Sequence, residues 1–223
     1  MKKRVAVLIS GRGSNMMSLV EAARDPAYPA EIVLVISNRQ EAAGLVWAAE
    51  QGIAAVCIDH KLYENRMAFE ARMHQTLLEH RVDLVCNAGF MRLLTTGFVE
   101  RWHDRHLNIH PSLLPLFPGL DTHQRVLDHG PLITGCTVHM VRTEMDSGPI
   151  LGQAAVPILP GDTAETLAER VLAAEHKLYP HVLRLVASGA VKIVNSTVVF
   201  SGAHPAEPPL YAPALPRSAG TTA

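Results

Sequence analysis

The chain has 223 residues, 20 Lys and Arg against 21 Asp and Glu, and 48% hydrophobic residues, a composition that is ordinary for a soluble globular protein and excludes wholesale disorder. The net charge of −1 gives no basic footprint for DNA or RNA, so we expect no nucleic-acid partner. Three dispersed cysteines without a CxxC pair exclude a zinc ribbon and speak against a disulfide framework. No apolar run reaches the about 18 residues of a membrane span, so we expect no membrane partner and a cytoplasmic location.

Short β-branched runs alternate with longer amphipathic runs in the first half of the chain. The runs predict strands over residues 5–10, 31–37, 54–58 and 82–87, and helices over residues 15–24, 42–51 and 64–80. Strands that alternate with helices of this length indicate βαβ units and a parallel sheet with helices on both faces.

The second half of the chain is less regular. It predicts strands over 105–109, 133–141 and 150–157, helices over 122–129 and 162–187, and a small hairpin over 191–194 and 197–200. We expect 133–141 and 150–157 to pair antiparallel. The fold class is therefore α/β with a mainly parallel sheet and an antiparallel C-terminal part, in one domain over residues 1–201. The Pro- and Ala-rich stretch 202–223 is predicted to be a poorly ordered tail.

A glycine-rich loop connects the first predicted strand to the first predicted helix. It reads Ser10-Gly11-Arg12-Gly13-Ser14-Asn15, and a helix N-terminus at the carboxyl end of a strand presents free N–H groups to an anion. We interpret the loop as a phosphate site; the alternative is a tight turn with Ser14 as N-cap. The third glycine of a dinucleotide fingerprint is replaced by Met16, but Arg39 could face the 2′-phosphate of NADPH, which leaves a reductase open.

The segment from Leu107 to Pro115 carries the most chemistry. Asn108 and His110 are two apart on a predicted strand, so both side chains face the same ligand, and Pro111 keeps His110 extended. Asp146 lies in a tight loop between two later strands, where a carboxylate can orient His110 and favour its protonated form. The bland alternatives are a packed loop histidine and a turn aspartate.

Six of the twelve histidines fall between His103 and His139, which suggests metal binding. His106 and His110 have helical ligand spacing, but their segment is a predicted strand, and no cysteine or carboxylate has matching spacing. We therefore expect no metal.

Four motifs occur in order along the chain. They are residues 7–15 (VLISGRGSN), 88–94 (AGFMRLL), 107–115 (LNIHPSLLP) and 145–150 (MDSGPI). Together they closely resemble the folate-dependent phosphoribosylglycinamide formyltransferases of purine synthesis, over about residues 4–200. Leu116 and Asp121 depart from the common pattern of that family.

The resemblance implies a Rossmann-like formyltransferase domain that transfers a formyl group from the co-substrate 10-formyltetrahydrofolate to the amine of 5-phosphoribosylglycinamide. Its catalytic residues would be Asn108, His110 and Asp146. The ribonucleotide would bind Gly13, Ser14, Asn15, Leu172, Ala173, Ala174 and Glu175. The folate would bind Arg66, Met91, Arg92, Leu93, Leu94, Asn108, Arg142, Thr143, Glu144, Met145 and Asp146. The partners would be these small molecules, and the protein would be a monomer or a homodimer.

The hypothetical mechanism aims the Asn108 amide and a protonated His110 at the formyl oxygen, with His110 as proton shuttle through a water held by Asp146. We expect neither the RNA-binding domain of methionyl-tRNA formyltransferase nor the regulatory domain of formyltetrahydrofolate hydrolase. The remaining alternatives are a formyltransferase acting on a sugar nucleotide or another amine and, from a different class, a nucleotide-binding module or an NADPH reductase.

Overall fold

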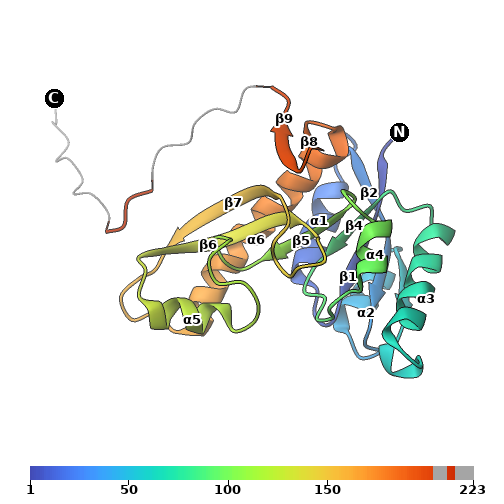
Figure 1. Cartoon of the computed structure of the whole chain (residues 1–223), viewed down its shortest axis with the longest axis horizontal. Helices are drawn as coiled ribbons and strands as arrows, with labels where there is room; N and C mark the ends of the chain where they lie inside the picture. The colour runs from blue at the N-terminus through green and yellow to red at the C-terminus, as the bar shows by residue number, and fades with distance from the viewer. Residues whose placement is uncertain (203–209, 214–223) are drawn as a thin grey trace.

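The computed structural model describes residues 1–202 and 210–213, which form a seven-stranded sheet, a small hairpin and flanking helices (Figure 1). The strands are β1 (Lys3–Ile9), β2 (Ala30–Ser37), β3 (Ala54–Cys57), β4 (Leu84–Asn87), β5 (His106–His110), β6 (Ile133–Met140), β7 (Ile150–Pro157), β8 (Val191–Val194) and β9 (Thr197–Phe200). The helices are α1 (Ser14–Ala23), α2 (Ala43–Glu50), the 3-10 turn η1 (His60–Leu62), α3 (Arg66–Glu79), α4 (Thr96–Arg101), α5 (Thr122–His129) and α6 (Ala164–Ser188).

The sheet has the strand order β3-β2-β1-β4-β5-β6-β7, and β8 pairs with β9 apart from it. The strands from β3 to β5 are parallel, whereas β6 runs antiparallel to β5 and β7 antiparallel to β6. The α/β class with an antiparallel C-terminal part is thus confirmed. Strands β2 and β3 are added on one side of β1, and the strands from β4 onward are added on its other side. Ligands of open α/β sheets bind beyond the strand ends at such a change in strand order.

Strand β1 shows why two helical layers form. Val5, Val7 and Ile9 pack on one face with α1, α2 and α6, while Ala6 and Leu8 pack on the other face with α3 and α4. Successive strand side chains point to opposite faces, so a strand that is apolar at every position needs a cover on both sides.

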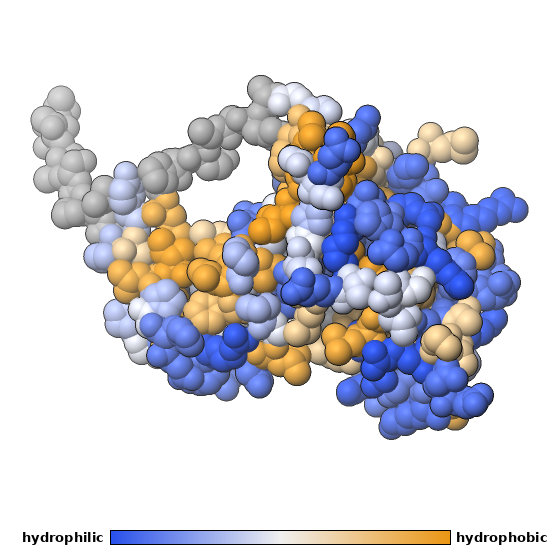
Figure 2. Space-filling model, viewed as in Figure 1, coloured by the Kyte–Doolittle hydropathy of each residue, from blue (hydrophilic) through white to orange (hydrophobic). Residues whose placement is uncertain are grey.

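Strands β6 and β7 extend away from the parallel strands, with α6 packed along them and α5 at their far end (Figure 1). On the visible face, hydrophilic side chains cover α3 and α4, and apolar side chains gather over β6 and β7 (Figure 2). Gly135 is required where the strands approach, because a Cβ there would lie 1.8 Å from the Ala154 carbonyl oxygen.

Most predicted elements occur within two residues of their expected bounds. Helix α6 begins at Ala164 instead of residue 162, because the Thr163 side chain caps the Thr166 N–H. The six-residue helix α4 was not predicted. The predicted tail, 202–223, lies largely outside the described residues. No helix in the described part of the chain is long and apolar enough to cross a membrane.

His106 gives the core an acid-sensitive point. Its side chain is buried, and desolvation lowers its pKa from 6.5 to about 3. Below pH 6.5 the unfolded chain therefore binds a proton that the folded chain does not, so stability falls as the pH falls toward the folded pKa. This residue contributes a loss of about 1.4 kcal/mol per pH unit in that window.

We predict that wild-type protein loses about 2 kcal/mol more unfolding free energy between pH 7 and pH 5 than a His106→Gln variant does. Urea unfolding at the two pH values measures the difference. Equal losses in the two proteins would contradict the burial of a neutral His106.

Candidate active site

A cleft of about 1060 Å³ lies where β4 and β5 end, between three connecting segments. Its walls come from the loop after β4, the loop and helix start after β5, and the loop between β6 and β7. The residues that line it are Arg66, Asn87, Gly89, Phe90, Met91, Arg92, Leu93, Leu94, Val99, Asn108, Ile109, His110, Pro111, Gly119, Leu120, Asp121, Thr122, His123, Gln124, His139, Val141, Arg142, Thr143, Met145, Asp146 and Ala164.

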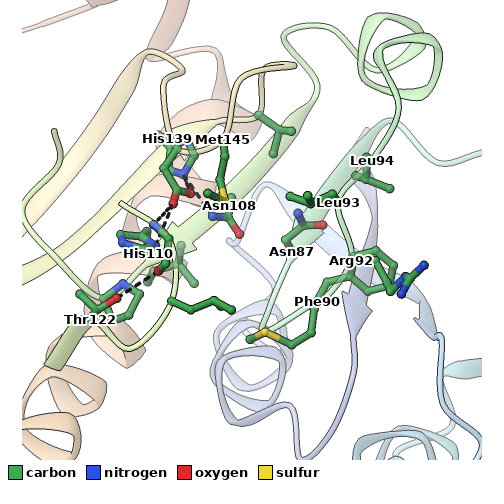
Figure 3. A pocket seen from close by; sticks show the side chains of 18 of the residues that line it. Asn87, Phe90, Arg92, Leu93, Leu94, Asn108, His110, Thr122, His139 and Met145 are labelled. Carbon is green, nitrogen blue, oxygen red and sulfur yellow. Dashed lines mark hydrogen bonds and ion pairs between the residues drawn. The ribbon is translucent and has the colours of Figure 1, made fainter. Parts of the chain in front are cut away.

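The structure brings Asn108, His110 and Asp146 together in this cleft (Figure 3). His110 Nε2 lies 2.9 Å from the Phe117 carbonyl oxygen. Because a carbonyl oxygen only accepts, Nε2 carries a proton and donates it to this bond. The other ring nitrogen, Nδ1, lies 3.4 Å from Asp146 Oδ2. The Phe117 carbonyl therefore orients the His110 ring, with the second nitrogen on the carboxylate side.

Asp146 accepts a hydrogen bond from a backbone donor and lies beside two histidine rings. The Gly119 N–H donates to Oδ2 at 2.9 Å, and Oδ1 lies 3.6 Å from His139 Nε2. Burial opposes ionisation, but the contact with His139 and the Gly119 N–H outweigh it and lower the pKa of Asp146. The site thus contains an ionised carboxylate. The backbone of Asp146 has φ +54°, in the left-handed region, where backbone strain is often found at functional sites.

His110 is neutral near pH 7. Burial lowers its pKa, and the Phe117 carbonyl and the Asp146 carboxylate only partly offset this effect. The expectation of a protonated His110 was therefore wrong, because desolvation of the imidazolium exceeds its attraction to Asp146.

His139 belongs to the site, and sequence reasoning missed it. It lies on β6 directly opposite Asn108 on β5. Its Nδ1 donates to the Met140 carbonyl oxygen at 3.0 Å, and its Nε2 lies 3.1 Å from Asn108 Nδ2. The signal was present in the predicted strand over 133–141, but only the strand register shows which residue meets Asn108.

The glycine-rich loop lies at the N-terminus of α1. Gly13, with φ +70°, is the N-cap residue, so the alternative with Ser14 as N-cap is wrong; Ser14 is the first residue of the helix. No side chain caps this helix start and its first turn carries no acidic residue. Its orphan N–H groups and the helix dipole suit an anion.

Helix α6 meets α1 at a buried polar contact. Asn15 Nδ2 donates to Glu175 Oε2 at 2.6 Å, and burial raises the pKa of the Glu175 carboxyl. Leu172 and Ala174 are half-buried and Ala173 is exposed on the preceding turn. The predicted ribonucleotide residues thus meet through Asn15 and Glu175, but none of them lines the large cleft.

The loops after β1 and β4 are joined by Ser10. Its hydroxyl accepts from the Met91 N–H at 2.8 Å and donates to Asn38 Oδ1 at 2.6 Å. The glycine-rich loop and the wall of the cleft are therefore neighbours at the same edge of the sheet.

The predicted folate residues all line the cleft except Glu144. Arg142 forms an ion pair with Asp104, which stands before β5 with φ +55°. This ion pair ties the start of the 142–146 loop to the corner between α4 and β5. A Cβ on Gly148 would lie 1.7 Å from the Met140 carbonyl oxygen, so a side chain there would push the end of the loop off the sheet.

Within residues 1–202 and 210–213, no group of three His, Cys, Asp or Glu side chains is placed to hold a metal ion. Of the clustered histidines, His110 and His139 both face Asp146, whereas others lie apart from that site. His103 contacts Glu100 and Asp104, and His129 Nδ1 is bonded to the Arg125 carbonyl.

The chain is similar to several known proteins. A formyl transferase family model matches residues 3–183. The chain is 54% identical over 192 residues to the trifunctional purine biosynthetic protein adenosine-3 of Bos taurus, covering 86% of this chain and 19% of that protein, and so spans about a fifth of that relative. It is 38% identical over 200 residues to phosphoribosylglycinamide formyltransferase of Haemophilus influenzae, covering 90% of this chain and 94% of that one.

Among solved structures, glycinamide ribonucleotide transformylase 1 from Symbiobacterium toebii superimposes with a TM-score of 0.87 at 44% identity, covering 89% of this chain and 94% of that chain. A formyltetrahydrofolate deformylase from Pseudomonas syringae superimposes with a TM-score of 0.81 at 25% identity, covering 90% of this chain and 66% of that chain. A protein named as a transformylase and a protein named as a deformylase thus share the same sheet.

We predict that Asp104→Asn frees Arg142 and speeds tryptic cleavage after Arg142 about two- to fivefold, the range expected for a partly exposed ion pair. Asparagine tolerates the left-handed backbone, so the variant removes only the charge. Mass spectrometry of fragments from the native protein measures the rate. Asp25→Asn, which breaks the distant pair with Arg184, is the control; equal cleavage in both variants would show that the ion pair does not restrain the loop.

Proposed function

The chain belongs to the formyl transferase family, and we propose that it transfers the formyl group of 10-formyltetrahydrofolate to the amine of 5-phosphoribosylglycinamide, a step of purine biosynthesis. The main support is the convergence of Asn108, His110 and Asp146 in one cleft whose walls are largely apolar. The likeness to the Haemophilus influenzae enzyme over 90% of this chain supports the same reaction.

In the proposed mechanism the substrate amine attacks the formyl carbon, and negative charge develops on the formyl oxygen. One N–H of the Asn108 amide is bonded to His139, which leaves the second for this oxygen. A donor that is already oriented stabilises the charge without reorganisation and commonly contributes 10²–10³ in rate.

The attacking amine must also lose a proton. The proton on Nε2 is committed to the Phe117 carbonyl, so the basic atom of neutral His110 is Nδ1. We assign to Nδ1 the acceptance of the amine proton, directly or through a water, and its later donation to N10 of the leaving folate. Asp146 lies 3.4 Å from Nδ1 and stabilises the imidazolium formed between the two steps.

We assign the phosphate of the ribonucleotide to the backbone N–H groups of Gly13, Ser14 and Asn15 together with the Ser14 hydroxyl. The uncapped start of α1 supports this assignment. Leu172, Ala173 and Ala174 would flank the ribose, and the Glu175 carboxyl would bind its hydroxyl groups.

We place the folate between Met91–Leu94 and the loop from Arg142 to Asp146, with Asn108 at the reacting end. Arg66 and Arg92 would bind the anionic glutamate tail, since both line the cleft. Glu144 does not line it, so we assign no contact to that side chain.

We further infer that residues 1–201 form the catalytic domain and that the protein acts in the cytoplasm as a monomer or a homodimer. The family match over residues 3–183 supports the domain. The three cysteines are free, as in proteins of reducing compartments.

His110→Ala should lower kcat for formyl transfer about 10³-fold, because the proton acceptor is lost. An absorbance assay with 10-formyltetrahydrofolate and 5-phosphoribosylglycinamide measures this. His181→Ala, an exposed histidine on α6, is the matched control. Absence of formyl transfer by the wild type, together with tight binding of NADPH in a spectroscopic titration, would instead support a reductase.

Asp146→Asn should lower kcat about 10²-fold or more, because the imidazolium loses its stabilising charge. The carboxylate raises the pKa of His110 against the effect of burial, so its removal should move the acidic limb of the kcat profile to lower pH. An unchanged kcat and an unchanged profile would refute the role of Asp146.

Ser14→Ala should raise KM for the ribonucleotide about tenfold, as expected for a hydrogen bond to a charged group. The KM for the folate should stay the same. Ser18→Ala, one turn later on α1, is the control. Equal effects on both KM values would contradict a phosphate site at this loop.

A further inference from the structure

A buried polar pair lies beneath the cleft and has no part in the mechanism above. His106 is 1% exposed, with its ring edge against Phe98. Its Nε2 lies 2.9 Å from Asn87 Oδ1, at the end of the neighbouring strand. Asn87 lines the cleft, whereas His106 lies behind it.

The pair presents one defined group to the cleft. His106 is neutral because burial lowers its pKa to about 3. Its Nε2–H donates to Asn87 Oδ1, so the amide nitrogen is the polar side-chain atom of Asn87 that remains to bind a ligand. Among the hydrogen bonds of the described residues, none uses this nitrogen. The Tyr179 hydroxyl donates to the Asn87 carbonyl oxygen at 3.0 Å, so the residue is fixed at its backbone as well.

Asn87 lies at the buried end of the cleft, beside the reacting groups. It is in register with Asn108 on the next parallel strand, and Figure 3 shows it between Asn108 and the 90–94 loop. Phe90, Val99 and Ile109 are buried lining residues. By contrast, Met91, Leu93 and Met145, which also line the cleft, are 53–61% exposed and form its rim.

The three parts of a folate match different positions in the cleft. The formyl group must reach Asn108 and His110, and the anionic tail must stay at the open side near the arginines. The planar heterocyclic ring is the part that benefits from a buried, largely apolar end with one polar contact, because it combines apolar faces with ring nitrogen and oxygen acceptors.

We propose, resting on the proposed function, that the Asn87 amide donates a hydrogen bond to the heterocyclic ring of the folate and that His106 is the positioning residue that turns this amide toward the ring. The pair would be a poor device for stability alone. His106 Nδ1 is buried without a partner, and an apolar pair of similar volume is often as stable or more stable.

The test is the double variant Asn87→Leu/His106→Leu, which replaces both partners and leaves no buried polar atom behind. We expect its melting temperature to equal or exceed that of the wild type and its Kd for tetrahydrofolate to be about tenfold weaker by calorimetry. Because stability and affinity move in opposite directions, misfolding cannot explain the result. The Kd for p-aminobenzoylglutamate, which lacks the ring, should not change.

One further variant isolates the pair. The single substitution His106→Gln keeps an N–H beside Asn87 Oδ1, so its Kd for tetrahydrofolate should lie within about twofold of the wild-type value. If the double variant binds tetrahydrofolate as tightly as the wild type, and the wild type transfers formyl groups, then the role proposed for Asn87 is wrong but the proposed function is not. A wild type that neither transfers formyl groups nor binds tetrahydrofolate would overturn the proposed function as well.

Discussion

Antiparallel pairing between β5 and β6 decides which side chains can meet at the site. It sets His139 opposite Asn108, and it returns the chain so that the 141–149 loop folds over β5 with Asp146 against His110. The loop is held at both ends. Arg142 binds Asp104 at its start, and Gly148 approaches the Met140 carbonyl at its end, where any side chain would collide with the backbone. The change from parallel to antiparallel pairing at β6 thus places the 141–149 loop beside the end of β5, where it forms the second wall of the cleft.

Desolvation controls the protonation of that cleft. The same burial that excludes water lowers the pKa of His110 and of His106, so both rings are neutral near pH 7. Neutral rings have one donor and one acceptor nitrogen, and backbone or amide oxygens fix which is which: Phe117 for His110 and Asn87 for His106. Of the three proposed catalytic residues, only Asp146 is charged, because its donors compensate for burial. These three residues therefore combine one fixed negative charge with oriented neutral groups, which suits proton transfer.

The sequence predicted the parts of this structure that depend on local pattern. Short β-branched runs predicted the strands, and Asn108 and His110 were found because strand residues two apart share a face. Helix α4 was missed because six residues are less than two turns and show no periodicity. His139 and Asn87 were missed for another reason: their importance follows from strand register, which joins residues far apart in the chain. The prediction that His110 is protonated was wrong because the sequence indicates a neighbouring charge but not how deeply the imidazole is buried.

Helix α6 contacts both binding regions with one rigid element. Glu175 bonds to Asn15 at the glycine-rich loop, and one turn later Tyr179 bonds to the backbone of Asn87 and Leu107 under the cleft. On the proposed function, one helix therefore supports both the ribonucleotide site and the folate cleft. The two substrates are then held in one arrangement, and the entropy of bringing them together is lost on binding instead of in the transition state.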